Sequence, residues 1–245
     1  MRRLSFCGII FVACASAPTP EDARAFYRQG YQYLNMGEIA KAKEEFKKAI
    51  KADSTFAEAY CRLGYIYAAE ENYPEAMLNY RKAIALNPGY AEAHYYFGLS
   101  LLATEDTAKA LEEFYAAVQS DSNHVLAREA LGSFLLAAGR YEEAYPHYEV
   151  LARMKPQDLN IQYTFAVLGY YSGHYNEALI PAQRVLAAND NNPEAHLLLG
   201  SILVQLGRYG EAGVELQKAV DQFNARGDAE NAAKAKGLLD KIRKK

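Results

Sequence analysis

Apolar residues recur along this chain at steps of three and four residues, which is the spacing of one face of an α-helix. Residues 57–90 show the pattern best, and their apolar or small positions are Tyr60, Leu63, Gly64, Tyr67, Ala76, Tyr80 and Ala83. Pro74 falls where the first turn of a second helix would lie, so its missing N–H costs nothing, and Asn87-Pro88 would end that helix. The segment therefore predicts two helices joined by a short turn.

The same pattern returns along the chain at one constant interval. A first set of equivalent positions holds Gly30, Gly64, Gly98, Gly132, Ala166 and Gly200, a second holds Ala42, Ala76, Ala110, Ala144, Ala178 and Ala212, and a third holds Phe46, Tyr80, Phe114, Tyr148, Ala182 and Leu216. A fixed period of this length is typical of repeat proteins. We predict six helix-turn-helix repeats without insertions, at residues 23–56, 57–90, 91–124, 125–158, 159–192 and 193–226.

Small residues in the first two sets allow the paired helices to approach closely, and the mostly aromatic third set fills the space around them. A glycine at positive φ is expected between the helices at Gly37, Gly139, Gly173 and Gly207. The fifth repeat departs most, and Pro181 within its second helix predicts a kink or looser packing; Pro146 in the fourth predicts the same more weakly. Residues 227–245 predict a helix with a basic C-terminus that caps the last repeat.

These repeats resemble tetratricopeptide repeats, whose pattern has a large residue, Leu-Gly, Tyr, Ala, an aromatic residue, Ala and Pro at set positions. Residues 57–90 match nearly all of it, and the resemblance covers 23–226. It implies an all-α fold, a right-handed superhelical solenoid with a capping helix, whose concave face is lined by the first helix of each repeat. Members that bind chaperone tails carry a cationic clamp of Lys and Asn; Tyr27, Tyr31, Glu92 and Tyr96 stand at the corresponding places here, so that clamp is absent.

The lining that the resemblance implies is aromatic. Tyr27, Tyr95 and Tyr163 lie in strict phase, each two repeats after the one before. A tyrosine offers a large contact area and a hydroxyl at low entropic cost, which suits capture of an extended or amphipathic segment. The predicted partner-binding residues are Tyr27, Tyr31, Tyr65, Tyr95, Tyr96, Tyr163 and Tyr170; the alternative is that several of them pack within or between repeats.

The first residues have the layout of a secretory signal, with two arginines, an apolar stretch from Leu4 to Ala13, and small residues after it. Residues 11–14 resemble the lipobox of bacterial lipoproteins, although Phe11 stands where Leu is usual. We expect a signal peptide at 1–13, a lipid on Cys14 and a linker at 14–22. Ordinary cleavage after Ala15 or Ala17 and an uncleaved N-terminal helix are the alternatives.

Composition and charge add exclusions. A formal charge of -3 gives no general attraction for nucleic acid, and the basic end of the chain, residues 234–245, fits a solvated helix end. His94 and His196 occupy a packing position, Cys61 is expected to pack within a helix, and no zinc, phosphate-loop or nucleophile motif is present in the sequence. We therefore expect no cofactor, no metal site and no catalysis.

The predicted function is that of a non-catalytic scaffold that binds protein partners through a peptide segment in its concave groove. With the expected lipid anchor, the chain would be exported to the bacterial periplasm or outer membrane. Six repeats after a lipobox are similar to the pilotin lipoproteins of type IV pili, and repeat-bearing lipoproteins that serve the cell wall or outer-membrane assembly are comparable. A soluble secreted or cytoplasmic co-chaperone or adaptor, and more remotely the binding part of a hydrolase, are the alternatives.

Overall fold

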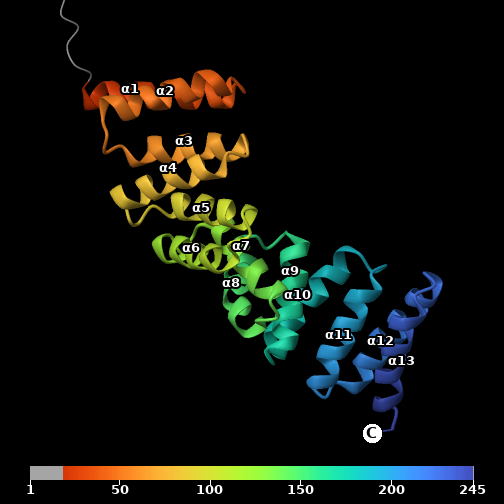
Figure 1. Cartoon of the computed structure of the whole chain (residues 1–245). Helices are drawn as coiled ribbons and strands as arrows, with labels where there is room; N and C mark the ends of the chain where they lie inside the picture. Colours follow the sequence, from red (N-terminus) through yellow and green to blue (C-terminus); the bar gives the residue numbers. More distant parts are fainter. Residues whose placement is uncertain (1–18, 245) are drawn as a thin grey trace, which may run out of the picture. The chain divides into compact units, whose positions relative to one another are not determined.

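A computed structural model describes residues 19–244, so the predicted signal segment and Cys14 lie outside the described residues. Over this range the structure is all-α, with thirteen helices and no strand (Figure 1). The helices are α1 (Pro20–Asn35), α2 (Ile39–Ala52), α3 (Ala57–Ala69), α4 (Tyr73–Leu86), α5 (Ala91–Ala103), α6 (Thr107–Ser120), α7 (Val125–Ala137), α8 (Tyr141–Met154), α9 (Leu159–Tyr171), α10 (Tyr175–Ala188), α11 (Pro193–Gln205), α12 (Tyr209–Ala225) and α13 (Ala229–Ile242). The predicted fold class is confirmed.

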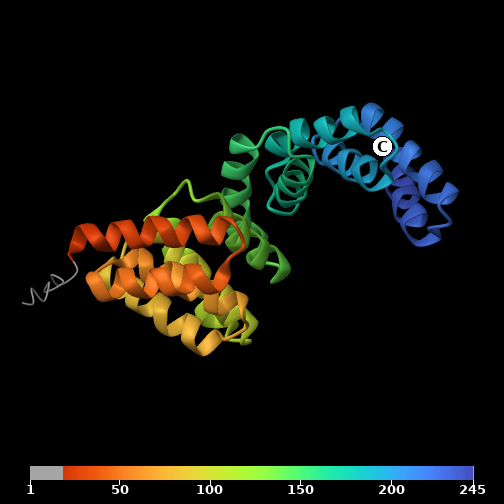
Figure 2. The same ribbon diagram turned by 90° about the horizontal axis from the view of Figure 1, so that it is seen from above.

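Within each unit consecutive helices pack in pairs: α1 with α2 and α3 with α4 in the first, and α7 with α8, α9 with α10 and α11 with α12 in the second. Helices α1 and α2 lie side by side in two views (Figures 1 and 2). We call the first helix of each pair helix A and the second helix B. The turn between them places one residue in the left-handed region, and the glycines predicted there have φ of 76° at Gly37, 71° at Gly139, 78° at Gly173 and 72° at Gly207. Glu71 and Glu105 occupy the equivalent positions with φ of 58° and 64°. The turn geometry therefore persists where glycine is replaced.

The chain divides into two compact units, Met1–Glu105 and Asp106–Lys245. The boundary falls inside the third repeat, between its helix A, α5, and its helix B, α6. The repeat pattern continues across this point without an insertion and gives no sign of it. Each unit therefore contains helices A and B of its own.

Close approach of the paired helices explains the glycine positions. A Cβ atom on Gly64 would lie 2.8 Å from Cε1 of Tyr80, and one on Gly200 would lie 2.7 Å from Cγ of Leu216. Both partners are fully buried helix B residues that belong to the third set of repeat positions. Any side chain at these glycines would therefore collide with the centre of the helix pair.

The fifth repeat reaches the same close packing by another route. Ala166 replaces the usual glycine and is fully buried, while a Cβ on Gly169, one turn later, would lie 2.9 Å from Cβ of Ala178. Helix α10 continues through Pro181, whose ring is buried, and α8 continues through Pro146. The point of closest contact between the two helices of this repeat has therefore moved along helix A, from the usual glycine position to Gly169.

The last helix packs on the repeat before it, as predicted for a cap. Ala232 and Ala235 of α13 join a buried cluster with Val220 and Phe223 of α12. Gly227, with φ of 75°, makes the connecting turn, and the side chain of Asp228 caps α13 by accepting a hydrogen bond from the backbone N–H of Asn231 at 3.0 Å. No helix between residues 19 and 244 has the length and apolar character needed to cross a membrane.

Candidate functional site

The predicted tyrosines lie on helices A of both units. In the first unit Tyr27 and Tyr31 belong to α1, Tyr65 to α3, and Tyr95 and Tyr96 to α5. Tyr31 is 43% exposed and Tyr65 is 37% exposed, whereas the other three are half-buried. We call the surface presented by these residues the helix A face of the first unit.

The tyrosines of this face differ in how far their rings are packed against other rings. The ring of Tyr96 lies 5.2 Å from that of Tyr65 and 5.1 Å from that of Tyr95, and it stacks at 6.2 Å on Tyr80. Burial raises the pKa of Tyr96 to about 12. Tyr96 is therefore held among other rings, and Tyr31 and Tyr65 carry most of the accessible aromatic area.

Tyr27 is also part of the packing. Its ring lies 5.6 Å from Phe46 and 5.1 Å from Phe56. Burial, above all, raises the pKa of the Tyr27 hydroxyl. The Tyr27 ring is therefore held by two phenylalanines of its own repeat.

An arginine that no sequence motif singles out ties this face together. The side chain of Arg62 in α3 is 16% exposed, and its Nη2 donates to Oε2 of Glu92 in α5 at 2.8 Å. Its Nε donates to the hydroxyl of Tyr27 at 3.4 Å, and its guanidinium lies 5.5 Å from the centre of the Tyr31 ring. Arg62 on α3 thus contacts residues of the other two helices A of the first unit, α1 and α5.

The charge of Arg62 is fixed by these contacts. Burial alone would lower its pKa, but the hydrogen bond with Tyr27 and the charge of Glu92 more than offset that effect and raise the pKa. Glu92 accepts a second hydrogen bond from the hydroxyl of Tyr90 at 3.1 Å, which holds the carboxylate in place. Arg62 therefore stays protonated beside the exposed ring of Tyr31, as the cation of an ion pair with Glu92.

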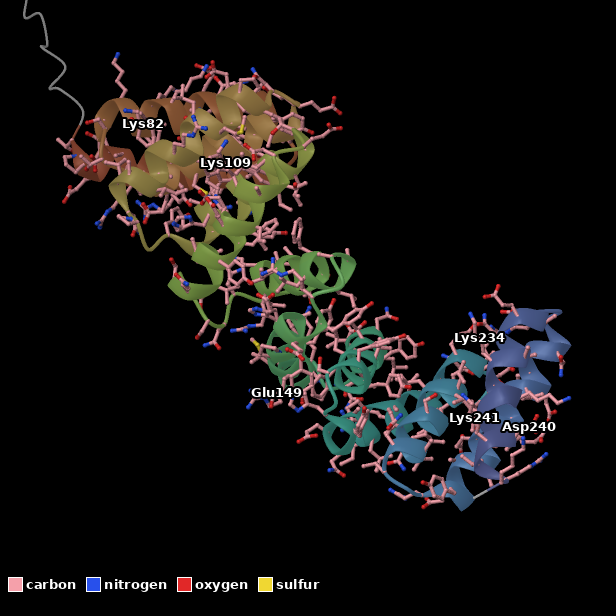
Figure 3. The ribbon with its side chains drawn as sticks, turned by 60° about the horizontal axis from the view of Figure 1, so that its bottom comes forward. Lys82, Lys109, Glu149, Lys234, Asp240 and Lys241 are labelled. Carbon is pink, nitrogen blue, oxygen red and sulfur yellow. The ribbon has the colours of Figure 1, made fainter. Side chains whose placement is uncertain are left out.

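The second unit has an aromatic hollow of about 380 Å³ between two of its helices A and the C-terminal helices. Its lining comes from α9, α11, α12 and α13 and includes Tyr163, Val167, Tyr170, Tyr171, Leu197, Leu198, Phe223 and Leu238. The charged groups around it are paired, with Glu194 2.9 Å from Arg226 and Lys234, labelled in Figure 3, 2.8 Å from Glu230. The hollow is therefore suited to an uncharged apolar side chain. Of the tyrosines predicted to bind a partner, Tyr163 and Tyr170 line this hollow, and Tyr171 lies beside them.

The histidine and cysteine side chains that could take part in catalysis or metal binding, His94, His196 and Cys61, are buried. His196 is fully buried; one of its ring nitrogens lies 2.6 Å from Oε2 of Glu215 and the other 2.8 Å from the carbonyl oxygen of Asp190. Nε2 of His94 lies 3.0 Å from the carbonyl oxygen of Pro88. Burial raises the pKa of the Cys61 thiol to about 12, so that thiol stays protonated at neutral pH. Residues 19–244 hold no group of three or more His, Cys, Asp or Glu side chains placed to bind a metal ion.

The fold and this face define a class: a helical repeat protein that binds other polypeptides. Two family models match the chain, one described as "TPR repeat" at residues 30–70 and 64–105, and one as "Tetratricopeptide repeat" at residues 95–158 and 163–229. The chain belongs to the tetratricopeptide repeat family. This is in general a non-catalytic protein-interaction fold, so the chain is a scaffold for protein-protein interaction.

Solved structures of repeat proteins share the fold. YrrB, described as a tetratricopeptide repeat protein with an unusual peptide-binding site, is 22% identical, with a TM-score of 0.64 over 78% of this chain and 97% of its own. PilW, described as a widely conserved type IV pilus biogenesis factor, is 17% identical, with a TM-score of 0.53 over 86% of this chain and 97% of its own. A tetratricopeptide repeat protein of Parabacteroides merdae is 14% identical, with a TM-score of 0.55 over 91% and 97%. No curated protein matches the sequence.

Proposed function

We propose that this protein is a scaffold of the bacterial cell envelope that binds an extended or helical segment of a partner protein on the helix A faces of its two units. The partner would belong to an assembly of the envelope, such as a pilus or secretion complex. A lipid on Cys14 would hold the protein at a membrane of the periplasm or at the outer membrane.

The observation that carries the binding proposal is the exposure of Tyr31 and Tyr65, at 43% and 37%, within an otherwise packed set of rings. The apolar surface of a large exposed aromatic side chain stays in contact with water until a partner buries it. Here that surface lies beside a cation that is held in place. Rigid neighbours reduce the entropy lost when a partner binds, because Tyr31 already rests against Arg62 and Tyr65 against Tyr96.

The envelope proposal rests on the N-terminal sequence, in which an apolar stretch follows two arginines and ends at Ala13-Cys14. The likeness of fold to PilW, a pilus biogenesis factor by its description, is compatible with such a role. At 17% identity this likeness concerns the fold alone.

Site-specific photo-crosslinking tests the binding proposal. A benzophenone amino acid at position 31 or 65 in cells should yield a discrete crosslinked partner. The same probe at Leu78, which is 52% exposed on helix B of the second repeat, is the matched control and should give none. Crosslinks from position 78 and none from positions 31 and 65 would place the partner on another surface.

Mass spectrometry of the mature N-terminus tests the anchor separately. We expect an acylated Cys14 in the membrane fraction. A free N-terminus at Ser16 or Pro18, with the protein in the soluble fraction, would remove the anchor and leave the binding face untouched.

A further inference from the structure

A small hollow of about 480 Å³ opens on the helix A face of the first unit, between α1 and α3. Five residues line it: Tyr27, Arg28, Tyr31, Gln32 and Arg62. Two of the five are arginines, and neither Asp nor Glu is among the described residues of this lining. The hollow is therefore walled by tyrosine rings and carries positive charge.

Arg62, one of the residues that line this hollow, is held in place by its contacts. Glu92 and Tyr27 take two of its three guanidinium nitrogens, Nη2 and Nε, and Tyr31 covers its plane. Within residues 19–244, Nη1 has no hydrogen-bond partner. A fixed guanidinium with a donor to spare loses little freedom when it binds an anion, which favours binding.

Arg28 supplies the second charge. It is exposed on α1, one turn before Gln32, and no ion pair or hydrogen bond of its side chain is found in the described part of the chain. Glu92 offsets the charge of Arg62, whereas Arg28 has no such counter-ion among the described residues. The hollow therefore carries a net positive charge.

We propose that this hollow binds the side-chain carboxylate of an Asp or Glu within the partner segment, which makes the first unit selective for an acidic residue next to an apolar one. A guanidinium matches a carboxylate in shape and charge, and the neighbouring Tyr27 and Tyr31 rings exclude water from the contact. The inference rests on the proposed function, because it names the chemistry of a partner bound at the same face.

This site differs from the cationic clamp that the sequence lacks. Tyr27, Tyr31 and Glu92 occupy places where clamp residues stand in chaperone-tail-binding members, and here all three hold Arg62. The anion-binding groups are Arg62 and Arg28 instead. The residues at the clamp positions here hold Arg62 in place and do not bind the anion themselves.

The test uses the purified protein and a library of random twelve-residue peptides displayed on phage. Each peptide is joined through its C-terminus to the coat protein, so only side chains can offer a carboxylate. We expect selection to enrich peptides with an Asp or Glu beside an aliphatic or aromatic residue. The selected peptides are then synthesised with acetylated and amidated ends, and their affinity is measured by fluorescence anisotropy.

Arg28→Ala should lower the affinity of the protein for the acidic peptides about five- to tenfold. The melting temperature should not change, because the Arg28 side chain is exposed. Replacing the peptide's Glu with Gln should cost at least that factor in the natural protein and less in the variant, where only Arg62 remains to bind the carboxylate. Lys82→Ala, an exposed lysine on α4 labelled in Figure 3, is the matched control and should bind like the natural protein.

The outcomes are distinct. Tyr31-dependent binders without acidic residues, or equal binding of Glu and Gln peptides, would overturn the inference and leave the proposed function standing. Failure to select any peptide whose binding depends on Tyr31 or Tyr65 would overturn the proposed function and the inference with it.

Discussion

Single residues decide how closely the paired helices approach and how the chain turns between them. Glycine appears at both kinds of position for different reasons. At Gly64 and Gly200 a side chain would meet a buried ring or branched carbon, whereas at Gly37 the space is open and only the positive φ requires glycine. The two kinds respond differently to substitution.

Glu71→Gly should stabilise the protein. Glu71 has φ of 58° at the turn position that glycine fills in other repeats, and a residue with a Cβ pays about 1 to 2 kcal/mol there. After the greater entropy of glycine in the unfolded chain is subtracted, we expect a gain of about 0.5 to 1 kcal/mol, measured by thermal unfolding. Ala69→Gly, at the last residue of helix α3, is the control and should bring no gain, because its backbone is helical and needs no glycine.

Gly64→Ala should destabilise the second repeat by about 1 to 3 kcal/mol, because the new methyl group would overlap the Tyr80 ring and approach the carbonyl oxygen of Ala76 at 3.1 Å. Denaturant titration measures the loss. Gly237→Ala in α13, where no atom lies within 4 Å of the added methyl, should instead be neutral or stabilising. Equal effects of the two substitutions would show that close approach is not what requires the glycine.

For single residues, the sequence predicted where the glycines are required. It also predicted that Tyr27 and Tyr31 share a helix, but it did not indicate Arg62. The spacing of Tyr27 and Tyr31 placed both on one helix, yet burial by Phe46 and Phe56 makes Tyr27 a packing residue. Arg62 was missed because its partners lie 35 residues before it and 30 residues after it in the chain. Contacts between repeats of that kind leave no local pattern.

Whole helices tolerate more than their local sequence suggests. Helices α8 and α10 both continue through an interior proline, because the packing of neighbouring helices outweighs the one hydrogen bond that proline removes. Pro181 is buried and contributes packing, whereas Pro146 is exposed. Local propensity is therefore a weak constraint on helix continuity inside a packed array.

Pro146→Ala should therefore stabilise α8 by about 1 to 3 kcal/mol, since the change restores a helical hydrogen bond and gives up no buried surface. Calorimetry would measure the gain. Pro74→Ala is the matched control: Pro74 lies in the first turn of α4, where no hydrogen bond is missing, so its replacement should bring no gain.

The contact between α7 and α8 should make stability depend on pH. Burial, and then the charge of Arg128, lower the pKa of His147 from the ordinary value of 6.5, and Arg128 donates to its Nδ1 at 3.3 Å. The folded state therefore favours neutral imidazole, so this contribution to stability is complete above pH 6.5 and decreases as the pH falls toward the lowered pKa. Melting temperatures of the natural protein should fall more between pH 8 and 5 than those of His147→Gln; equal slopes would contradict the assignment.

At the scale of the whole molecule, the constant period of the pattern was enough to predict an all-α repeat fold, because each repeat is specified by its own apolar positions. The division after Glu105 was not predicted, since it depends on how densely successive helices pack and the pattern runs through it unchanged. The phase of the repeat predicted which helices carry the tyrosines, whereas the exposed fraction of each side chain could be obtained only from the structure.

The central claim, that the helix A face binds a partner through its open tyrosines, is tested most directly by affinity. The captured partner segment should bind Tyr31→Ala and Tyr65→Ala about tenfold more weakly, with melting temperatures within a few degrees of the natural protein. Leu78→Ala, at least as exposed but on helix B, should bind as the natural protein does. Unchanged affinity for both tyrosine variants, or affinity lost only as the variants unfold, would contradict the claim.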